Sequence, residues 1–326
     1  MFLLDSHCDT PSQILRGRDL SIDNTDAHVD FPKLKRGGVD GAFFAIYVPA
    51  ALSEADALEH AVGQLDAVEV MLNENSDKAS LTTSVQQAYR NQSEGLFSVF
   101  LGLENGSLIG NSIDRVKWLY DKGIRYITLC HSADNQLCDS CSSDVKKWGG
   151  LSPFGKEVVK EMNKLGILID VSHLSDDSFY DVLKYSARPV VATHSCCRAL
   201  AGHPRNMTDD MIRDLAAAGG VIQINFYPVF LDDSFNEEDM PTSPKPSYKR
   251  VVDHIDHVVE LVGIDHVGIG SDFDGIDVAP DGLEDISMMP RILSELRVRG
   301  YTEDDIEKIT SLNFFSVFSS SDAGRS

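Results

Sequence analysis

The chain has 326 residues, of which 42% are hydrophobic and 25% are charged, a composition that is ordinary for a globular protein. With 29 basic and 51 acidic residues its net charge is −22, which repels nucleic acid and anionic membrane surfaces, so neither is expected as a partner. No apolar stretch approaches the roughly 20 residues that cross a bilayer, and the first predicted strand begins at residue 2, where a signal peptide would stand, so we expect a cytoplasmic protein.

Eight short apolar runs, rich in β-branched and aromatic residues, are predicted to be strands. Stretches with a helical period of apolar residues separate most of them, and several begin at Ser, Thr or Asp and end at Gly, as helices do. In chain order the predicted strands are 2–6, 39–48, 96–103, 125–130, 167–171, 189–193, 220–225 and 266–271. The clearest predicted helices are 54–74, 152–166, 176–185, 208–219 and 248–263, and two more, 288–300 and 302–320, follow the last strand.

Strands that are apolar along their whole length and alternate with helices indicate a parallel sheet covered on both faces. Eight such units fit an α/β fold of the closed (β/α)8 TIM barrel type better than an open doubly wound sheet, and no Gly-x-Gly-x-x-Gly motif follows the first strand. The Pro- and Ser-rich stretch 234–247 is predicted to be a long loop after the seventh strand. We therefore expect a single domain over residues 1–326.

The six cysteines do not suggest a disulfide scaffold in so long a chain. Cys138 and Cys141 have the spacing of a redox or zinc motif, but no second Cys-x-x-Cys pair accompanies them, so we predict an ordinary loop pair. Cys8 stands between His7 and Asp9 and should point away from both, because adjacent residues of a strand face opposite sides.

Polar residues gather where the predicted strands end. In a TIM barrel the carboxyl ends of the strands form the mouth at which the chemistry takes place. Any one of these residues, taken alone, is more often a satisfied polar group than a ligand, but together they converge on one mouth, and burying so many acids and imidazoles is costly without a cation. The residues are His7 and Asp9, Glu104, His131, Asp170 and His173, His194, and Asp272 and Asp274.

This set of side chains favours a metal centre. Three histidines with Asp and Glu suit zinc or a similar divalent ion. Five ligands exceed the need of one catalytic zinc, which keeps a position open, so two ions that share one carboxylate fit better, and Glu104 is the natural bridge. Two ions about 3.5–4 Å apart can hold a hydroxide between them and polarise a carbonyl oxygen, so the sequence predicts metal-assisted hydrolysis.

Eight ordered motifs resemble those of the membrane (renal) dipeptidase family, the dizinc peptidases of the amidohydrolase-like barrel group. They are DSHCDTP, GLENG, RYITLCHS, DVSH, PVVATHS, HPRNMTDD, NFYP and GIGSDFDG, and the resemblance extends from residue 5 to about residue 315. It implies a zinc-dependent dipeptidase that hydrolyses the peptide bond of small dipeptides, including those with a D-residue at the C-terminal position. It also implies one zinc on His7 and Asp9, a second on His173 and His194, and Glu104 as the bridge between them.

The resemblance implies further roles at the same mouth. His131 would stabilise the oxyanion, and Arg205 would bind the terminal carboxylate of the substrate, a task that suits a planar bidentate donor. Asp272 would bind the substrate and transfer protons during the attack on the peptide bond and the departure of the amine. Glu104 would be the third catalytic residue, with His131 and Asp272. Phe230 stands where better-known secreted members carry a tyrosine, and the chain lacks their lipid-anchor signal and disulfides.

Two alternatives stay open. The same metal site could serve another amidohydrolase, such as an N-acyl amino acid hydrolase or a lactamase, whose substrate would not require Arg205 if it lacks a carboxylate. A non-catalytic binding protein is disfavoured, because every ligand position is filled. The sequence also leaves a homodimer open.

Other polar residues are predicted to have supporting roles. His254 and His257 lie three apart on a predicted helix, far from any strand end, and are predicted to lie on its solvated face. Asp170 is expected to orient a neighbouring ligand histidine, because ligating imidazoles usually donate their second N–H to a carboxylate or carbonyl. Asp5 and Asp274 are expected to lie behind the ligands or to cap the backbone.

Overall fold

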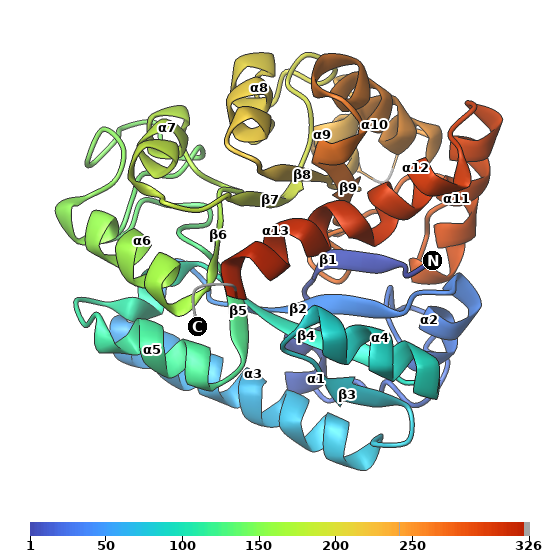
Figure 1. The fold of residues 1–326 in the computed structure, drawn as a ribbon, viewed down its shortest axis with the longest axis horizontal. Helices are drawn as coiled ribbons and strands as arrows, with labels where there is room; N and C mark the ends of the chain where they lie inside the picture. Colours follow the sequence, from blue (N-terminus) through green and yellow to red (C-terminus); the bar gives the residue numbers. More distant parts are fainter. Residues whose placement is uncertain (241, 323–326) are drawn as a thin grey trace.

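The computed structural model describes residues 1–240 and 242–322, and at its centre eight parallel strands form a barrel ringed by helices (Figure 1). Each strand of the series pairs in parallel with the next, and Cys8 at the end of the first strand pairs with Phe273 after the last, which closes the ring. This arrangement confirms the predicted (β/α)8 TIM barrel. The strands are β1 (Leu4–Cys8), β2 (Gly41–Tyr47), β4 (Phe97–Glu104), β5 (Ile124–Thr128), β6 (Leu168–Asp170), β7 (Val191–Ser195), β8 (Val221–Ile224) and β9 (Val267–Ile269).

One strand lies outside the ring and was not predicted. β3 (Ala79–Leu81) pairs in parallel with the first half of β4 and extends the sheet locally. Its three residues run from buried to exposed, so it lacks the continuous apolar run that marks the barrel strands. By contrast, every residue of β4 is buried, because β4 has a helix layer on one side and the barrel interior on the other.

Helices connect the strands and cover the outside of the barrel (Figure 1). Ser53, Ser152 and Thr208 begin three of them, and each side-chain oxygen accepts the backbone N–H three residues further on, as expected of N-caps. The helices are α1 (Thr10–Leu15), α2 (Phe31–Gly37), α3 (Glu54–Glu74), α4 (Val85–Glu94), α5 (Asp114–Asp121), α6 (Pro153–Leu165), α7 (Asp176–Tyr185), α8 (Asp209–Ala217), α9 (Pro228–Leu231), α10 (Lys249–Val262), α11 (Met289–Val298), α12 (Glu303–Glu307) and α13 (Asn313–Asp322).

The predicted loop 234–247 links α9 to α10 and contains a short 3₁₀ turn, Glu237–Asp239. Residue 241 of this loop and the last four residues of the predicted domain lie outside the described residues. In the described part of the chain, no helix has both the length and the apolar character that a membrane crossing requires.

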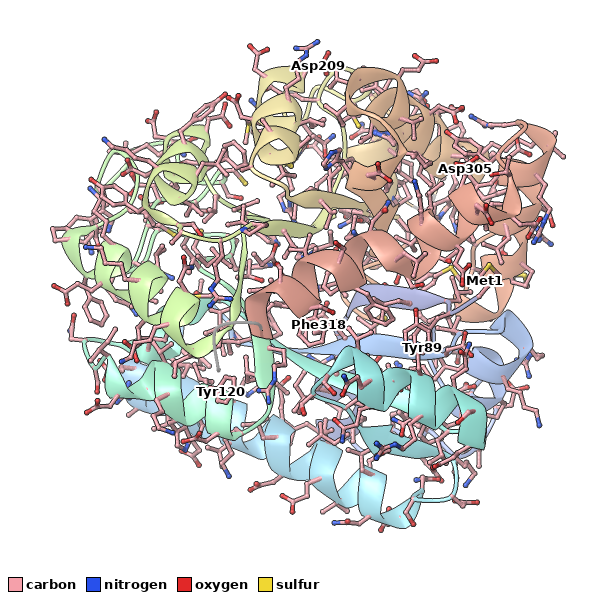
Figure 2. All side chains as sticks on the ribbon, viewed as in Figure 1. Met1, Tyr89, Tyr120, Asp209, Asp305 and Phe318 are labelled. Atoms are coloured by element: carbon pink, nitrogen blue, oxygen red, sulfur yellow. The ribbon has the colours of Figure 1, made fainter. Side chains whose placement is uncertain are left out.

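Aromatic residues close the barrel at the amino ends of its strands. Helix α13 crosses the front of the barrel in Figure 1, and Phe318 lies near the centre of the same view in Figure 2. Phe318 and Phe314 pack against the strand residues Phe100 and Phe43, with ring centroids 5.7 and 5.2 Å apart. Because this end is filled by apolar side chains, only the opposite end, formed by the carboxyl ends of the strands, is left for polar chemistry.

The prediction for His254 is wrong. The residue is fully buried on α10, where its Nδ1 accepts the backbone N–H of Cys197 at 3.0 Å and its Nε2 donates to the carbonyl of Leu231 at 3.0 Å. His257, the second histidine of the pair, is half-buried and lies 2.8 Å from an oxygen of Asp209. The helical period of apolar residues does place His254 on the buried face of α10. The prediction failed because the sequence does not show that the backbone supplies hydrogen-bond partners for both ring nitrogens, which is what allows a histidine to be buried there.

We expect His254→Ala to destabilise the protein by about 2–4 kcal/mol at pH 7.5, because it leaves a buried N–H and a buried carbonyl without partners. Burial lowers the pKa of His254 from its usual 6.5 to about 4. On acidification His254 is therefore protonated near pH 6.5 in the unfolded chain but stays neutral in the folded chain until about pH 4. The wild type should therefore lose about 2 kcal/mol more than the variant between pH 7.5 and 5. Urea unfolding in chelator measures both differences.

His257→Ala is the matched control on the same helix. Its partly exposed pair with Asp209 should contribute about 1 kcal/mol or less. Equal destabilisation by the two variants would contradict the structural role of His254.

Candidate metal centre

The five residues predicted as ligands meet at the carboxyl-end mouth of the barrel. His7 Nε2 lies 3.4 Å from Asp9 Oδ2 and 3.7 Å from Glu104 Oε2. On the other side, His173 Nε2 and His194 Nε2 lie 3.1 and 3.3 Å from Glu104 Oε1, and 3.0 Å from each other. The structure thus forms two triads that share Glu104 and could each hold a metal ion, and the two oxygens of Glu104 face one triad each. His7 and His194 also form a third such group with Asp272.

Irregular backbone at the strand ends directs these side chains. The pairing register of β1 shifts between Asp5 and Cys8, and that of β7 shifts between Ala192 and Ser195, so His7 and His194 each lie in a bulge. Bulges re-aim side chains at the rims of barrels. His173 is in the left-handed region with φ 69°, a conformation that is uncommon for non-glycine residues and that clusters at functional sites.

The residues around the two triads are suited to binding a cation. His7 Nε2 and Asp9 Oδ1 are buried polar atoms without a hydrogen-bond partner, and such orphans are costly in a folded protein. Gly275 makes room for them, because a Cβ there would overlap the Asp9 carboxylate and crowd Asp272. Imidazole nitrogens and carboxylate oxygens are the donors that zinc and related divalent ions prefer.

The two histidines of the second triad are neutral. Burial, and then the nearby charge of Arg205, lowers the pKa of His173 well below its usual value. Burial, reinforced by His7 and Arg205, does the same for His194. Neutral imidazoles are the form that binds metal ions.

Three carboxylates share this small buried space. Burial opposes ionisation of Glu104, but the charges of His7 and His131 outweigh it and hold its pKa well below the usual range. Burial and the charge of Glu104 raise the pKa of Asp9 to about 6. Burial, opposed by His7 and reinforced by Asp9 and Glu104, raises the pKa of Asp272 to about 7. Such mutual repulsion is relieved when cations lie among the acids.

Asp272 and His131 flank the triads. Asp272 Oδ1 lies 3.9 Å from His7 Nε2, and Oδ2 accepts the side-chain N–H of Asn225 at 2.8 Å. His131 is partly exposed, and its Nε2 lies 3.9 Å from Glu104 Oε1. Both residues therefore border the space in which a substrate would meet the two triads.

Arg205 lies beside the second triad with its guanidinium almost fully buried. Nη1 donates to Ser195 Oγ and Nη2 to the carbonyl of His194, each at 2.7 Å, whereas the buried Nε has no partner. The Phe230 ring lies 5.7 Å from the guanidinium carbon, within cation–π range. The guanidinium is thus held by β7 beside the second triad.

Sequence reasoning missed two residues of this mouth. Tyr47 ends β2, and its ring lies at a steep angle to the ring of His131, with the centroids 4.9 Å apart. Asn225 follows β8 and holds Asp272. Neither residue is charged or a histidine, so neither stands out among the residues at the strand ends. The signal that could have identified them is an uncharged polar side chain at the carboxyl end of a barrel strand.

Asp170 does not contact a ligand histidine directly. Its Oδ2 accepts the hydroxyls of Thr128 and Thr193, and Thr193 in turn lies 2.8 Å from His194 Nδ1. The expected link between carboxylate and imidazole therefore runs through a hydroxyl.

The other predicted supporting residues stabilise the backbone. Asp5 Oδ1 accepts the backbone N–H groups of His7 and Ser271. Asp274 accepts hydrogen bonds from Arg18 and Thr10 and so ties the segment after β1 to the mouth.

All six cysteines are free. Cys8 Sγ lies 3.8 Å from Ser271 Oγ, away from the ligand side chains. Cys138 is buried and Cys141 half-buried in the loop after β5.

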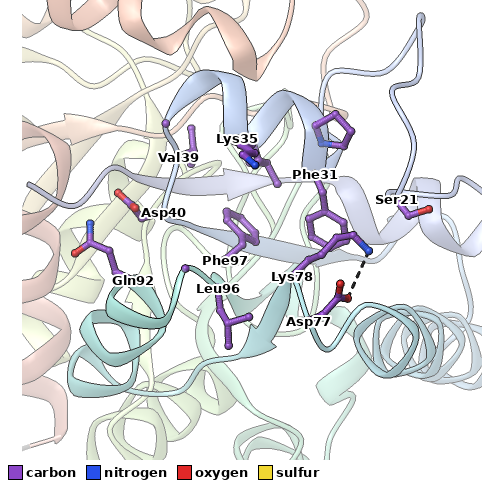
Figure 3. A pocket seen from close by; sticks show the side chains of 14 residues that line it. Ser21, Phe31, Lys35, Val39, Asp40, Asp77, Lys78, Gln92, Leu96 and Phe97 are labelled. Atoms are coloured by element: carbon purple, nitrogen blue, oxygen red, sulfur yellow. Dashed lines mark hydrogen bonds and ion pairs between the residues drawn. The ribbon is translucent and has the colours of Figure 1, made fainter.

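A cavity of about 630 Å³ lies near the amino ends of β2, β3 and β4, away from the mouth (Figure 3). Its lining comes from α2 and from the segments that lead into β2, β3 and β4, and includes Phe31, Phe97 and Leu96. Of its two carboxylates, Asp40 accepts the backbone N–H of Leu3 and Asp77 pairs with Lys78. None of the predicted ligands lines this cavity.

A parallel eight-stranded barrel with two histidine–carboxylate triads at its mouth is typical of metal-dependent hydrolases. The model of the membrane dipeptidase family, Peptidase family M19, matches residues 1–325, and the chain belongs to that family. It is therefore a metallo-dipeptidase, a hydrolase that acts on peptide bonds.

Individual relatives and solved structures support the same family assignment. The chain is 34% identical over 334 residues to Dipeptidase verJ of Clonostachys rogersoniana, covering 98% of this chain and 84% of that protein. It is 32% identical to Dipeptidase tcpJ of Claviceps purpurea, covering 96% and 75%. The metallo peptidase of Rhodobacter sphaeroides, liganded with a phosphinate mimic of the dipeptide L-Ala-D-Ala, superposes with a TM-score of 0.90 at 26% identity, covering 98% and 99%. The probable dipeptidase PvdM of Pseudomonas aeruginosa gives 0.92 at 26% identity, covering 99% and 96%.

Proposed function

We propose that this protein is a two-zinc dipeptidase that accepts dipeptides with a free terminal carboxylate, including those whose C-terminal residue is D. The observation that carries the proposal is the position of Glu104, whose two carboxylate oxygens each face a separate triad. His7, Asp9 and Glu104 would hold one ion, and Glu104, His173 and His194 the other. The D-residue is supported by the L-Ala-D-Ala mimic bound to the Rhodobacter sphaeroides relative.

When bound, the two ions would supply Lewis acidity that activates water and polarises the scissile carbonyl. Asp272 would move the proton: Asn225 occupies Oδ2, so Oδ1 is left to take a proton from the attacking water and pass it to the leaving amine.

Substrate orientation would come from the other two residues. His131 turns its Nε2 toward Glu104 and would donate to the oxyanion that develops at the scissile carbonyl. Arg205 would bind the terminal carboxylate through its guanidinium, whose Nε has no partner among the described residues. Because Arg205 is hydrogen-bonded to the carbonyl of the ligand His194, its fixed distance from the triads would select substrates with one residue after the scissile bond.

The decisive measurement is amino acid release from dipeptides such as L-Ala-L-Ala and L-Ala-D-Ala. We expect turnover to fall about 100-fold or more after chelation and to return with Zn²⁺, with two zinc ions per chain by elemental analysis, because the protein groups alone do not replace the metal's charge. Full turnover by metal-free protein would reject the proposal. Hydrolysis of N-acetyl amino acids or lactams in place of dipeptides would favour the alternative amidohydrolase.

A further inference from the structure

Two hydroxyl groups lie directly beneath the ligand imidazoles. Thr193 Oγ1 lies 2.8 Å from Nδ1 of His194, and the Tyr126 hydroxyl lies 2.8 Å from Nδ1 of His7. Thr193 Oγ1 is also 3.5 Å from His7 Nδ1, but this contact is longer and therefore weaker than the one that Tyr126 makes. All four residues are fully buried. Each hydroxyl thus meets the ring nitrogen that points away from the triads, and of the two triads that share Glu104, one contains His7 and the other His194.

The direction of the Thr193 hydrogen bond follows from its other partner. Its hydroxyl donates to Asp170 Oδ2 at 2.7 Å, and the backbone N–H groups of Ser172 and Thr193 donate to Asp170 Oδ1. A hydroxyl has one hydrogen, so Thr193 Oγ1 can only accept from His194. His194 must then carry its hydrogen on Nδ1, which leaves the Nε2 lone pair facing Glu104 and His173.

Tyr126 reaches His7 because β4 makes room for it. A Cβ at Gly102 would overlap the Tyr126 ring, which also packs 5.1 Å from the ring of Phe43. The ring therefore has one position, with its hydroxyl against His7 Nδ1, while His7 Nε2 faces Asp9. A cation on Nε2 requires the hydrogen on Nδ1, where the phenol oxygen accepts it.

We propose that Thr193 and Tyr126 are positioning residues that each set the affinity of one metal site. Thr193, supported by Asp170, orients His194 for the site formed with Glu104 and His173, and Tyr126 orients His7 for the site formed with Asp9 and Glu104. The inference rests on the ligand assignment of the proposed function.

The test first removes one of the two metal sites, so that the zinc affinity of the remaining site can be measured alone. An Asp9→Ala background retains only the His173–His194 site, and a His173→Ala background only the His7–Asp9 site. Zinc dissociation constants come from competition with a chromophoric chelator at one pH. Thr193→Val should weaken binding about 10–100-fold in the Asp9→Ala background and less than about threefold in the other. Tyr126→Phe should give the reverse pattern.

Two further variants isolate the hydroxyl of residue 193. Thr193→Ser retains the hydroxyl and should bind zinc as the parent does. Thr128→Val removes a hydrogen bond to the same Asp170 oxygen without touching an imidazole, so it should leave both affinities within about threefold. Should Thr193→Val fail to fold, Thr193→Ala takes its place in the comparison with Thr193→Ser.

The outcomes distinguish this inference from the proposed function. A wild-type protein that binds no zinc overturns both. A wild-type protein that binds two zinc ions, with unchanged affinities in the Thr193 and Tyr126 variants, overturns the positioning roles and leaves the dipeptidase proposal standing. Equal weakening of both sites by either variant overturns the assignment of one hydroxyl to one site.

Discussion

The Glu104→Gln protein is expected to lose both metal ions and to hydrolyse dipeptides about 1,000-fold more slowly than the wild type, a loss of roughly 4 kcal/mol in transition-state stabilisation. The physical reason is that Glu104 contributes one oxygen to each triad, 3.7 Å from His7 Nε2 and 3.1 Å from His173 Nε2. A glutamine of the same shape offers one neutral oxygen and an NH2 group that cannot ligate a cation. Metal content by elemental analysis, beside dipeptide turnover, measures the effect.

Single-site variants supply the comparison. His7→Ala and His173→Ala each remove one triad and should each leave one ion, whereas Glu104→Gln should leave less than one. Glu295→Gln is the matched control, because Glu295 is also buried but pairs with Lys249 and Arg299 on the outer helices. It should retain both ions. A Glu104→Gln protein that holds two ions would show that the triads do not share this carboxylate.

Much of the barrel could be predicted from sequence because its strands are buried on both faces. Such strands are continuous apolar runs, and β2 and β4 are the clearest examples. β3 could not be recognised, because three residues that run from buried to exposed carry no periodic signal. The helix around Phe314 and Phe318 was predicted, but its place across the amino ends of the strands depends on aromatic contacts with Phe43 and Phe100 far away in sequence.

The mouth was predicted for a related reason. Strand ends are visible in sequence, and the rule that chemistry lies at the carboxyl ends of barrel strands selects the histidines and carboxylates there. The supporting layer was not visible, because Tyr126, Thr193 and Asn225 are ordinary polar residues whose partners lie about fifty to more than a hundred positions away or depend on a bulge. Asp170 illustrates the limit: its link to an imidazole was expected, but the intervening hydroxyl emerged only from the fold.

Arg205→Ala is expected to lower kcat/KM for dipeptides about 100-fold or more, roughly 3 kcal/mol, because removal of one partner from a buried charged hydrogen bond leaves the other desolvated. Arg205 is held by Ser195 and by the carbonyl of His194, and its Nε is a buried donor without a partner. For the corresponding dipeptide amides, which lack the carboxylate, wild type and variant should differ by less than about threefold. Steady-state kinetics with both substrates measure the difference.

Further variants distinguish two roles of Arg205: binding of the substrate carboxylate and structural support of the metal site. Arg205→Lys keeps the charge but not the planar fork, so it should recover only part of the activity. Arg198→Ala is the nearby control, because Arg198 is already paired with Asp176 and should not contact substrate. Since Arg205 also touches the backbone of the ligand His194, zinc content must be measured: equal loss of activity on dipeptide and amide together with loss of zinc would mean that Arg205 supports the metal site and does not read the carboxylate. A selective loss on the dipeptide with zinc retained would instead establish the carboxylate as the feature that makes this barrel a dipeptidase rather than a general amidohydrolase.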